Sequence, residues 1–347
     1  MIYRHSCFRD SLDSAATAWE TAPRNRDLLA ETAADRNKPG AETVTLVISN
    51  CSKRKRTPLD PTLHAGALAE GSSATVATAW AKRLRAAKPT VLAGELYGGR
   101  AFHDAAKTAK SLDARLAIVS AGLGLVAGTT SVPSYSLTTA AGDPDGILVK
   151  TASTPSEWWA SIQTQSPFHT TAVETEDGLI LAALSSGYLA MVAEEWAQWP
   201  SERRDRLRLF TKEQPHGAAE DLLPAWMPYD DRLDALGNGH AGTQSDFAQR
   251  ALRHFASAIA AEGTQDEHRR AVEASLAGYF ARQLPTRAKR SDEEITAIIK
   301  RDWDIVQGRS GAMLRRLRDD LATACEQGRF KRLFALVSAA RKNGRVR

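Results

Sequence analysis

Short apolar stretches alternate along this chain with longer segments of helical periodicity. The uninterrupted, β-branched stretch at 43–48 is typical of a strand that is buried on both faces. Further apolar stretches follow at 90–93, 115–120, 179–184 and 206–210, and amphipathic segments separate them. This alternation predicts an α/β fold, in which a mostly parallel sheet of about four to six strands forms the middle of three layers.

Helical patterning and turn residues divide the chain into three segments. Residues 1–40 are a weakly periodic helical lead-in, residues 41–284 hold the predicted α/β domain, and residues 285–347 form a small helical domain. In the last segment Ser291 and Glu294 have the spacing of a capping box. Two apolar stripes at helical spacing follow it: Met313, Leu314, Leu317 and Leu321, then Phe330, Leu333, Phe334 and Val337.

Positive charge is concentrated in the last segment. Residues 285–347 contain 16 Lys/Arg and 8 Asp/Glu, a net of +8, whereas the whole chain carries +5, so the other 284 residues carry −3. A concentrated basic segment is the electrostatic footprint of a nucleic-acid-binding domain, although a solvated basic surface has the same composition. The cations expected on the open faces of its helices are Arg315, Arg316, Arg318, Arg329, Lys331 and Arg332.

Composition argues against several classes of protein. No apolar stretch approaches the length of a membrane span, and the N-terminus lacks the apolar region of a signal peptide, so we expect a cytoplasmic protein without a membrane partner. The cysteines Cys7, Cys51 and Cys325 are far apart and lack CxxC spacing. The histidines show no metal-ligand spacing either. We therefore expect neither a disulfide framework, nor a metal, nor a cofactor.

The loop after the first strand has the composition of an anion or nucleotide site. Asn50, Cys51 and Ser52 are followed at once by a basic run that includes Lys53 and Lys55. Ligands of open α/β sheets bind at the carboxyl ends of strands, where such loops gather. A solvated basic turn would look the same. Cys51 has no neighbouring histidine in the sequence, which favours a small buried thiol over a nucleophile.

The second predicted strand leads into Glu95 and Tyr97, and Arg100 follows. A carboxylate at this place can orient water or stabilise an oxocarbenium ion, as carboxylates do in glycoside cleavage. A glutamate at a helix N-terminus is also favoured by the helix dipole alone, so the structural alternative stays open.

Two later strands also end in small polar residues. Ser120 and Gly122 follow one of them, and the other is followed by Ser185, Ser186 and Tyr188, whose hydroxyls can contact a base edge or a phosphate. Serine at this position is equally common as an ordinary helix cap. Because parallel strands end at one edge of a sheet, we expect all these loops to form one pocket. His240, in a glycine-rich turn, is a further candidate for this pocket.

These motifs also carry a family resemblance. The segments CSKRK, ELYGGRAF, IVSAGLGLV and SVPSYSLTT resemble the YaaA-like proteins and, more distantly, the uracil-DNA-glycosylase-like and archaeosine-synthase-core superfamilies, over residues 43–255. Anti-phage glycosylases that remove glucosylated bases are relatives of this group. The chain departs from the family at 122–124, where a lysine and an aromatic residue are common, and it lacks the Asp-Pro-Tyr-His signature.

The resemblance implies a uracil-DNA-glycosylase-like fold and a DNA glycosylase that hydrolyses the N-glycosidic bond of a flipped-out, modified base in phage DNA. Glu95 would position water or stabilise the sugar cation, and Asn50 and Tyr97 would orient it. The residues expected to bind substrate are Cys51, Ser52, Lys53, Lys55, Arg100, Ser120, Gly122, Tyr135, Ser185, Ser186, Tyr188 and His240. Two alternatives remain open: a non-catalytic DNA-binding protein, and an RNA-modifying enzyme related to the tRNA-base transglycosylases.

Overall fold

The computed structural model describes residues 43–171, 177–237, 239–259, 261–281 and 286–344. The lead-in predicted at 1–40 and Cys7 lie outside these residues. Contacts divide the chain into two compact units, with the division between Ala281 and Arg282, close to the boundary expected at 284/285.

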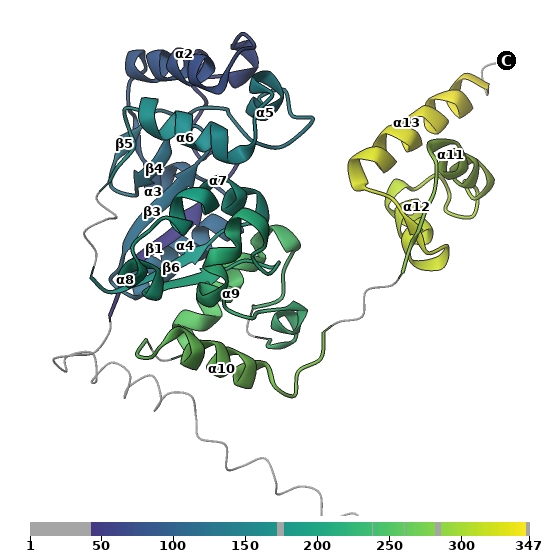
Figure 1. The fold of residues 1–347 in the computed structure, drawn as a ribbon. Coiled ribbons are helices and arrows are strands. Elements are labelled where there is room, and N and C mark those ends of the chain that lie inside the picture. The colour runs from purple at the N-terminus through teal and green to yellow at the C-terminus, as the bar shows by residue number, and fades with distance from the viewer. Residues whose placement is uncertain (1–42, 172–176, 238, 260, 282–285, 345–347) are drawn as a thin grey trace, which may run out of the picture. The chain divides into compact units, whose positions relative to one another are not determined.

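The first unit is built around a five-stranded sheet with the strand order β4-β3-β1-β6-β7 (Figure 1). The strands β1 (Val44–Asn50), β3 (Arg115–Ser120), β6 (Leu179–Ala183) and β7 (Leu207–Phe210) run parallel. The edge strand β4 (Gly124–Ala127) runs antiparallel to β3. The prediction of a mostly parallel sheet in an α/β fold is therefore confirmed.

Two details of the predicted sheet are wrong. The stretch at 90–93 does not enter the central sheet, because β2 (Val91–Leu92) pairs with β5 (Ser131–Val132) in a separate antiparallel ribbon. The segment after Ser120, expected to be a loop, contains β4 instead. Gly124 has a φ of +76°, a conformation that glycine adopts without strain and that lets the chain reverse directly.

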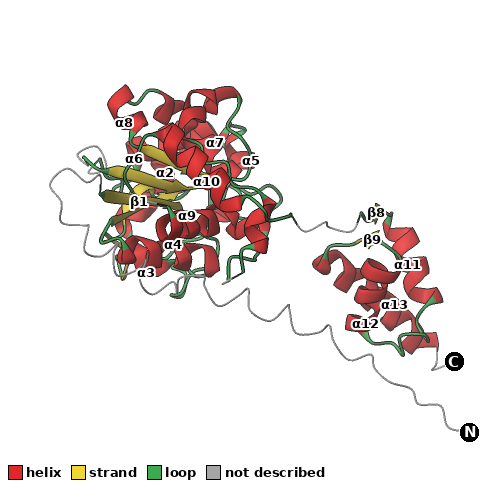
Figure 2. Ribbon diagram, turned by 90° about the horizontal axis from the view of Figure 1, so that it is seen from below, coloured by secondary structure: helices red, strands yellow, loops and turns green. Residues whose placement is uncertain are grey.

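The alternation of side chains along β1 explains why helices cover both faces of the sheet. Leu46 and Ile48 belong to one core and Val47 to the other. The first core is covered by α2 (Ser73–Ala86), α6 (Pro155–Gln165) and α7 (Ser186–Ala197). The opposite face is covered by α4 (Arg100–Ser111) and α9 (Phe247–Ala258). Figure 2 shows the strands between these two groups of helices.

Tryptophans fill the first core. Trp158 and Trp159 of α6 are both buried, together with Trp80 of α2. The unit also contains one longer helix, α10 (Gln265–Leu276), and three short helices, α3 (Ala93–Leu96), α5 (Ile147–Thr151) and α8 (Ser201–Asp205). Its 3-10 segments are Ala65–Ala67, Gly217–Ala225, Asp231–Ala235 and Gln244–Asp246.

The C-terminal unit is helical and has its own core. It contains α11 (Asp292–Arg301), α12 (Ser310–Arg315), a π-helical turn at Arg316–Asp320 and α13 (Gln327–Gly344). The strands β8 (Ala288–Lys289) and β9 (Thr323–Ala324) pair in parallel. The capping box is present, with both reciprocal bonds between Ser291 and Glu294.

Most of the predicted apolar stripes form the core of this unit. The buried residues of this core are Ile295, Ile299, Val306, Met313, Leu317, Cys325, Phe330, Leu333 and Val337. Across the part of the chain that the structure describes, no helix is long and apolar enough to cross a membrane.

Candidate functional site

The order of the strands creates a natural binding position between β1 and β6. The chain leaves β1 toward β3 on one side of the sheet, whereas it leaves β6 toward β7 on the other side. Ligands of open α/β sheets bind outside the carboxyl ends of the two strands at which the connections diverge in this way. Asn50 is the last residue of β1, and the main-chain N–H of Ser185, just after β6, donates to Asn50 Oδ1 at 3.1 Å.

A buried amide fixes the orientation of the Asn50 side chain. Gln249 Nε2 lies 3.2 Å from Asn50 Oδ1, 3.2 Å from Ser49 Oγ and 3.1 Å from the carbonyl oxygen of Ala183. Gln249 is only 1% exposed, so these bonds replace those that it would make to water. This contact ties α9 to the ends of both central strands.

Sequence reasoning missed Gln249. The available signal was a lone amide between Phe247 and Leu252, on the face of an amphipathic helix that points into the core. A buried amide without partners is costly, so such a residue predicts a specific hydrogen bond in the interior.

Cys51 and Tyr188 meet across the same position. Cys51 Sγ lies 3.0 Å from the hydroxyl oxygen of Tyr188, which belongs to the first turn of α7. The thiol is buried, in agreement with the structural alternative, and the phenol is half-buried. Burial raises the pKa of Tyr188, so its hydroxyl stays protonated at neutral pH.

Three buried hydroxyl groups, here called the hydroxyl triad, belong to Ser120 at the end of β3, to Tyr97 just after α3, and to Tyr135. Ser120 Oγ is 2.6 Å from the Tyr135 hydroxyl oxygen, which is 3.0 Å from the Tyr97 hydroxyl oxygen. Ser120 Oγ also accepts hydrogen bonds from the main-chain N–H groups of Gly122 and Leu123. Burial raises the pKa of both tyrosines, so the triad is a neutral, fully buried network.

Lys55 is directly connected to the triad. Its Nζ lies 4.5 Å from the centre of the Tyr135 ring and 5.2 Å from the centre of the Tyr97 ring. The ammonium donates to the carbonyl oxygen of Ser52 at 2.9 Å. Burial lowers the pKa of this lysine.

Other residues of the basic loop are already bound within the protein. Ser52 Oγ lies 2.6 Å from the carbonyl oxygen of Gly98 and 2.9 Å from that of Arg54. Lys53 forms an ion pair with Asp143, although its side chain remains 66% exposed. Both residues were expected to bind substrate, but only Lys53 is exposed to solvent, whereas Ser52 is half-buried.

Glu95 lies apart from the triad. It is exposed in α3, and no hydrogen bond or ion pair joins it to the other candidates among the described residues. The argument that placed it at the carboxyl edge of the central sheet fails, because the strand before it, β2, belongs to the separate ribbon. From this loop, Tyr97 reaches the cluster.

A groove of about 340 Å³ lies at the carboxyl ends of β6 and β7, and its lining includes Ser185, Ser186 and Lys212. Ser185 occupies the N-cap position of α7, yet its side chain makes no capping bond, so the capping alternative is not realised. A larger hollow of about 620 Å³ lies farther along α7 and is lined by Glu194, Glu220 and Asp221. Those three carboxylates would repel a phosphate more than the groove, whose lining holds Lys212 and one carboxylate, Glu213.

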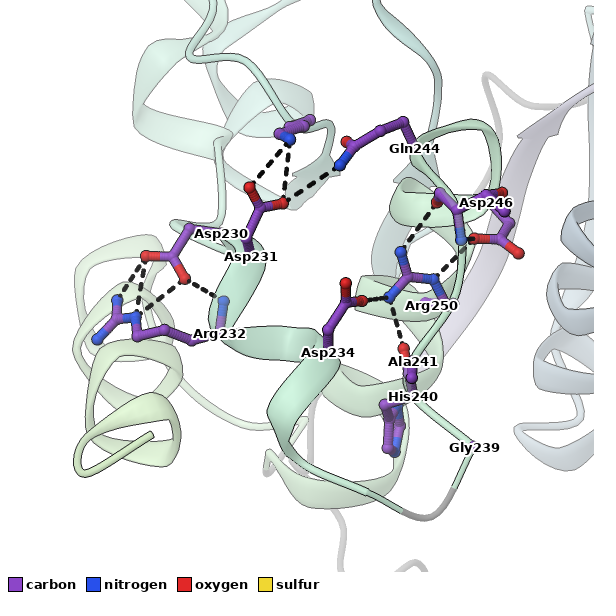
Figure 3. A network of polar contacts seen from close by, with 12 residues as sticks. Asp230, Asp231, Arg232, Asp234, Gly239, His240, Ala241, Gln244, Asp246 and Arg250 are labelled. Carbon is purple, nitrogen blue, oxygen red and sulfur yellow. Dashed lines mark hydrogen bonds and ion pairs between the residues drawn. The ribbon is translucent and has the colours of Figure 1, made fainter. Parts of the chain in front are cut away.

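His240 belongs to a polar network beside α9 (Figure 3), and Arg100 contacts the same loop. Arg100 donates to the carbonyl oxygens of Gly239 and Ala241, at 2.6 and 2.9 Å. The carbonyl oxygen of His240 accepts from Arg250. These contacts hold the loop that precedes α9, and none of them reaches the hydroxyl triad.

We predict that His240 makes the protein less stable in mild acid. Burial and the nearby cations, Arg253 first among them, lower its pKa from 6.5 to about 4. Between these values the unfolded chain binds a proton that the folded protein does not. The contribution of His240 is therefore complete above pH 6.5 and is lost as the pH falls toward 4. Urea midpoints should fall less between pH 7 and pH 4.5 in His240→Gln than in the wild type, and equal falls would contradict this assignment.

The six basic residues that were expected on the open faces of the C-terminal helices divide into two groups. Arg316 pairs with Asp302, Arg329 pairs with Asp292, and Arg318 donates to a main-chain carbonyl oxygen. These three arginines are half-buried and hold the unit together, which differs from the expectation that all six cations are open. The exposed ones are Arg315, Lys331 and Arg332.

Within the described ranges, no group of three or more His, Cys, Asp or Glu side chains could hold a metal ion. Comparison of the chain with protein-family models, with curated proteins and with solved structures found no match.

Proposed function

We propose that this chain is a DNA glycosylase-like enzyme that hydrolyses the N-glycosidic bond of a modified base in DNA. The observation that carries the proposal is the set of contacts that joins the loops after β1 and β6: Asn50 bonds to Ser185, and Cys51 bonds to Tyr188. From the same loop after β1, Lys55 lies over two rings of the buried hydroxyl triad.

Cleavage of this bond needs a base that is turned out of the helix and polar groups that stabilise charge on the departing base. Asn50 suits this role. Its Oδ1 is held by Ser185 and Gln249, and one Nδ2 hydrogen bonds to the carbonyl oxygen of Cys51 at 3.0 Å. The second Nδ2 hydrogen is left for the substrate or a water molecule, and a donor fixed in advance stabilises developing charge without reorganisation.

The groove and the C-terminal unit supply candidate contacts for the DNA backbone. Lys212 is 38% exposed in the groove and pairs with Asp231 at 3.0 Å. A volume of about 340 Å³ lies within the range of about 300–1,000 Å³ that is usual for small-molecule sites. Arg315, Lys331 and Arg332 are exposed cations that suit sequence-independent contacts with phosphates.

The test is base release from glucosylated phage DNA, scored as alkali-labile abasic sites, with unmodified DNA as the control. We expect Asn50→Ala to lower the rate about 100- to 1,000-fold, the effect of losing one positioned donor. Glu95→Gln should keep most of the activity, because Glu95 is exposed and apart from the cluster.

Other outcomes would redirect the proposal. Loss of activity in Glu95→Gln, together with an active Asn50→Ala, would return the catalytic role to Glu95. Binding of DNA without base release by the wild type would refute hydrolysis and support a DNA-binding protein. Exchange of a labelled base into tRNA would instead support an RNA-modifying enzyme.

We predict that the exposed cations of the C-terminal unit bind phosphates. The triple variant Arg315→Gln, Lys331→Gln, Arg332→Gln should bind DNA more weakly. The slope of log K against log salt should fall by about one for each lost contact. Fluorescence anisotropy across a salt series measures both quantities, with the exposed Lys82→Gln of α2 as a control. An unchanged slope in the triple variant would limit these residues to a structural or solubilising role.

A further inference from the structure

Lys55 is the one amine among the predicted loop residues that meets the hydroxyl triad. The side chain is half-buried, with Nζ over the rings of Tyr97 and Tyr135. An isolated bridge between the main chains of Lys55 and Tyr97 fixes the position from which the side chain extends. The amine is therefore held near the ends of the central strands and is still reachable from solvent.

The amine of Lys55 lies among neutral acceptors rather than carboxylates. Its ammonium group donates to the carbonyl oxygens of Ser52 and Lys53, at 2.9 and 3.4 Å. Within the described part of the chain no carboxylate forms an ion pair with it, whereas its neighbour Lys53 pairs with Asp143. Burial lowers the pKa of Lys55, and the nearby Lys53 adds to this effect, whereas Cys51 opposes it; the phenols that face the amine are neutral. A buried lysine without a counter-ion is the usual form of an amine nucleophile.

We propose that the Lys55 amine forms an imine with the ring-opened sugar of an abasic site in DNA. The substrate rests on the function proposed above, since base removal leaves such a sugar. The sugar presents an aldehyde at C1′, which is the class of carbonyl with which lysine amines condense. Cation-accepting carbonyl oxygens and aromatic faces around Nζ would hold the iminium that results.

The step balances without a further reactant. The nitrogen lone pair adds to C1′, and a proton moves from nitrogen to the former carbonyl oxygen. A second proton, taken up from solvent, lets that oxygen leave as water, and a protonated C=N bond replaces C=O. The imine makes the C2′ hydrogen acidic, so its loss to water expels the 3′ phosphate with the electron pair of the C3′–O bond. The products are a strand break and, after hydrolysis, free Lys55.

The experiment uses the full chain and an oligonucleotide that already contains an abasic site, with sodium borohydride present to reduce the imine. A covalent one-to-one adduct should form, and fragmentation mass spectrometry should place it on Lys55. The variant Lys55→Arg keeps the charge but cannot form an imine, so it should still bind abasic DNA while the adduct falls at least about 100-fold, to background. The exposed Lys82→Arg of α2 should react like the wild type.

Several results would overturn the proposal. In the wild type, these results are an adduct that maps to Lys53 or to the N-terminal amine, the absence of any adduct, and the absence of binding to the abasic oligonucleotide. In Lys55→Arg, the contradicting result is an adduct of wild-type yield. Anisotropy and thermal unfolding establish that Lys55→Arg is folded and binds. Because the abasic site is supplied ready-made, imine formation can be seen even where base release from modified DNA fails, and the two proposals are tested apart.

Discussion

Arg250→Met is expected to lower the free energy of unfolding by about 3–5 kcal/mol, the usual cost of removing one partner from a buried ion pair. The guanidinium is 1% exposed and contacts Asp234 Oδ1 at 2.5 Å and Asp246 Oδ1 at 2.8 Å. Figure 3 shows it between these two carboxylates. Its loss would leave Asp246, whose side chain is 8% exposed, with only the more distant Arg100, at 3.8 Å, as a cationic partner.

A control for this prediction lies in the same network. Arg232 pairs with Asp230 at 2.9 Å, but the two side chains are 31% and 52% exposed. Arg232→Met should therefore change the free energy of unfolding by less than about 1 kcal/mol. Urea unfolding at pH 7 measures both variants. Equal, small losses would show that the Arg250 network contributes little to stability.

Gly122→Ala is expected to destabilise the protein by about 3 kcal/mol, the upper end of the range for overpacking a tight core. A Cβ at this position would overlap the ring of Tyr135 and lie 2.9 Å from its Cδ2 atom. The main chain cannot move away freely, because the carbonyl oxygen of Gly122 accepts from Trp80 Nε1 at 2.7 Å. The added methyl group should also push Tyr135 away from Ser120.

Gly187→Ala is the matched control, since a Cβ there meets nothing within 4 Å. Because Gly187 lies in α7, alanine should leave stability unchanged or raise it by up to about 1 kcal/mol. Urea unfolding and the near-ultraviolet dichroism of the tyrosines report on the two variants. A stable Gly122→Ala with unchanged dichroism would mean that the triad tolerates a shift of this loop.

The local pattern of apolar and polar residues was sufficient to predict the strands and helices and the class of fold. The apolar stretches predicted at 43–48, 115–120, 179–184 and 206–210 are strands of the central sheet, and the alternation with helices correctly predicted parallel strands. The stripes of the last segment likewise form a core. These features follow from periodicity, because burial of an apolar face is decided by residues a few positions apart.

Tertiary structure alone decided which strands pair and which side chains meet. The apolar stretch at 90–93 pairs outside the central sheet, which removes the reason for placing Glu95 at its edge. Conversely, Cys51 meets Tyr188, and Gln249 holds Asn50. These contacts join residues far apart in the chain. Their hydrogen bonds depend on strand order and helix packing, which leave no periodic trace in the sequence. The sequence therefore determined the layers of this protein and most of its candidate residues, but not the contacts among them.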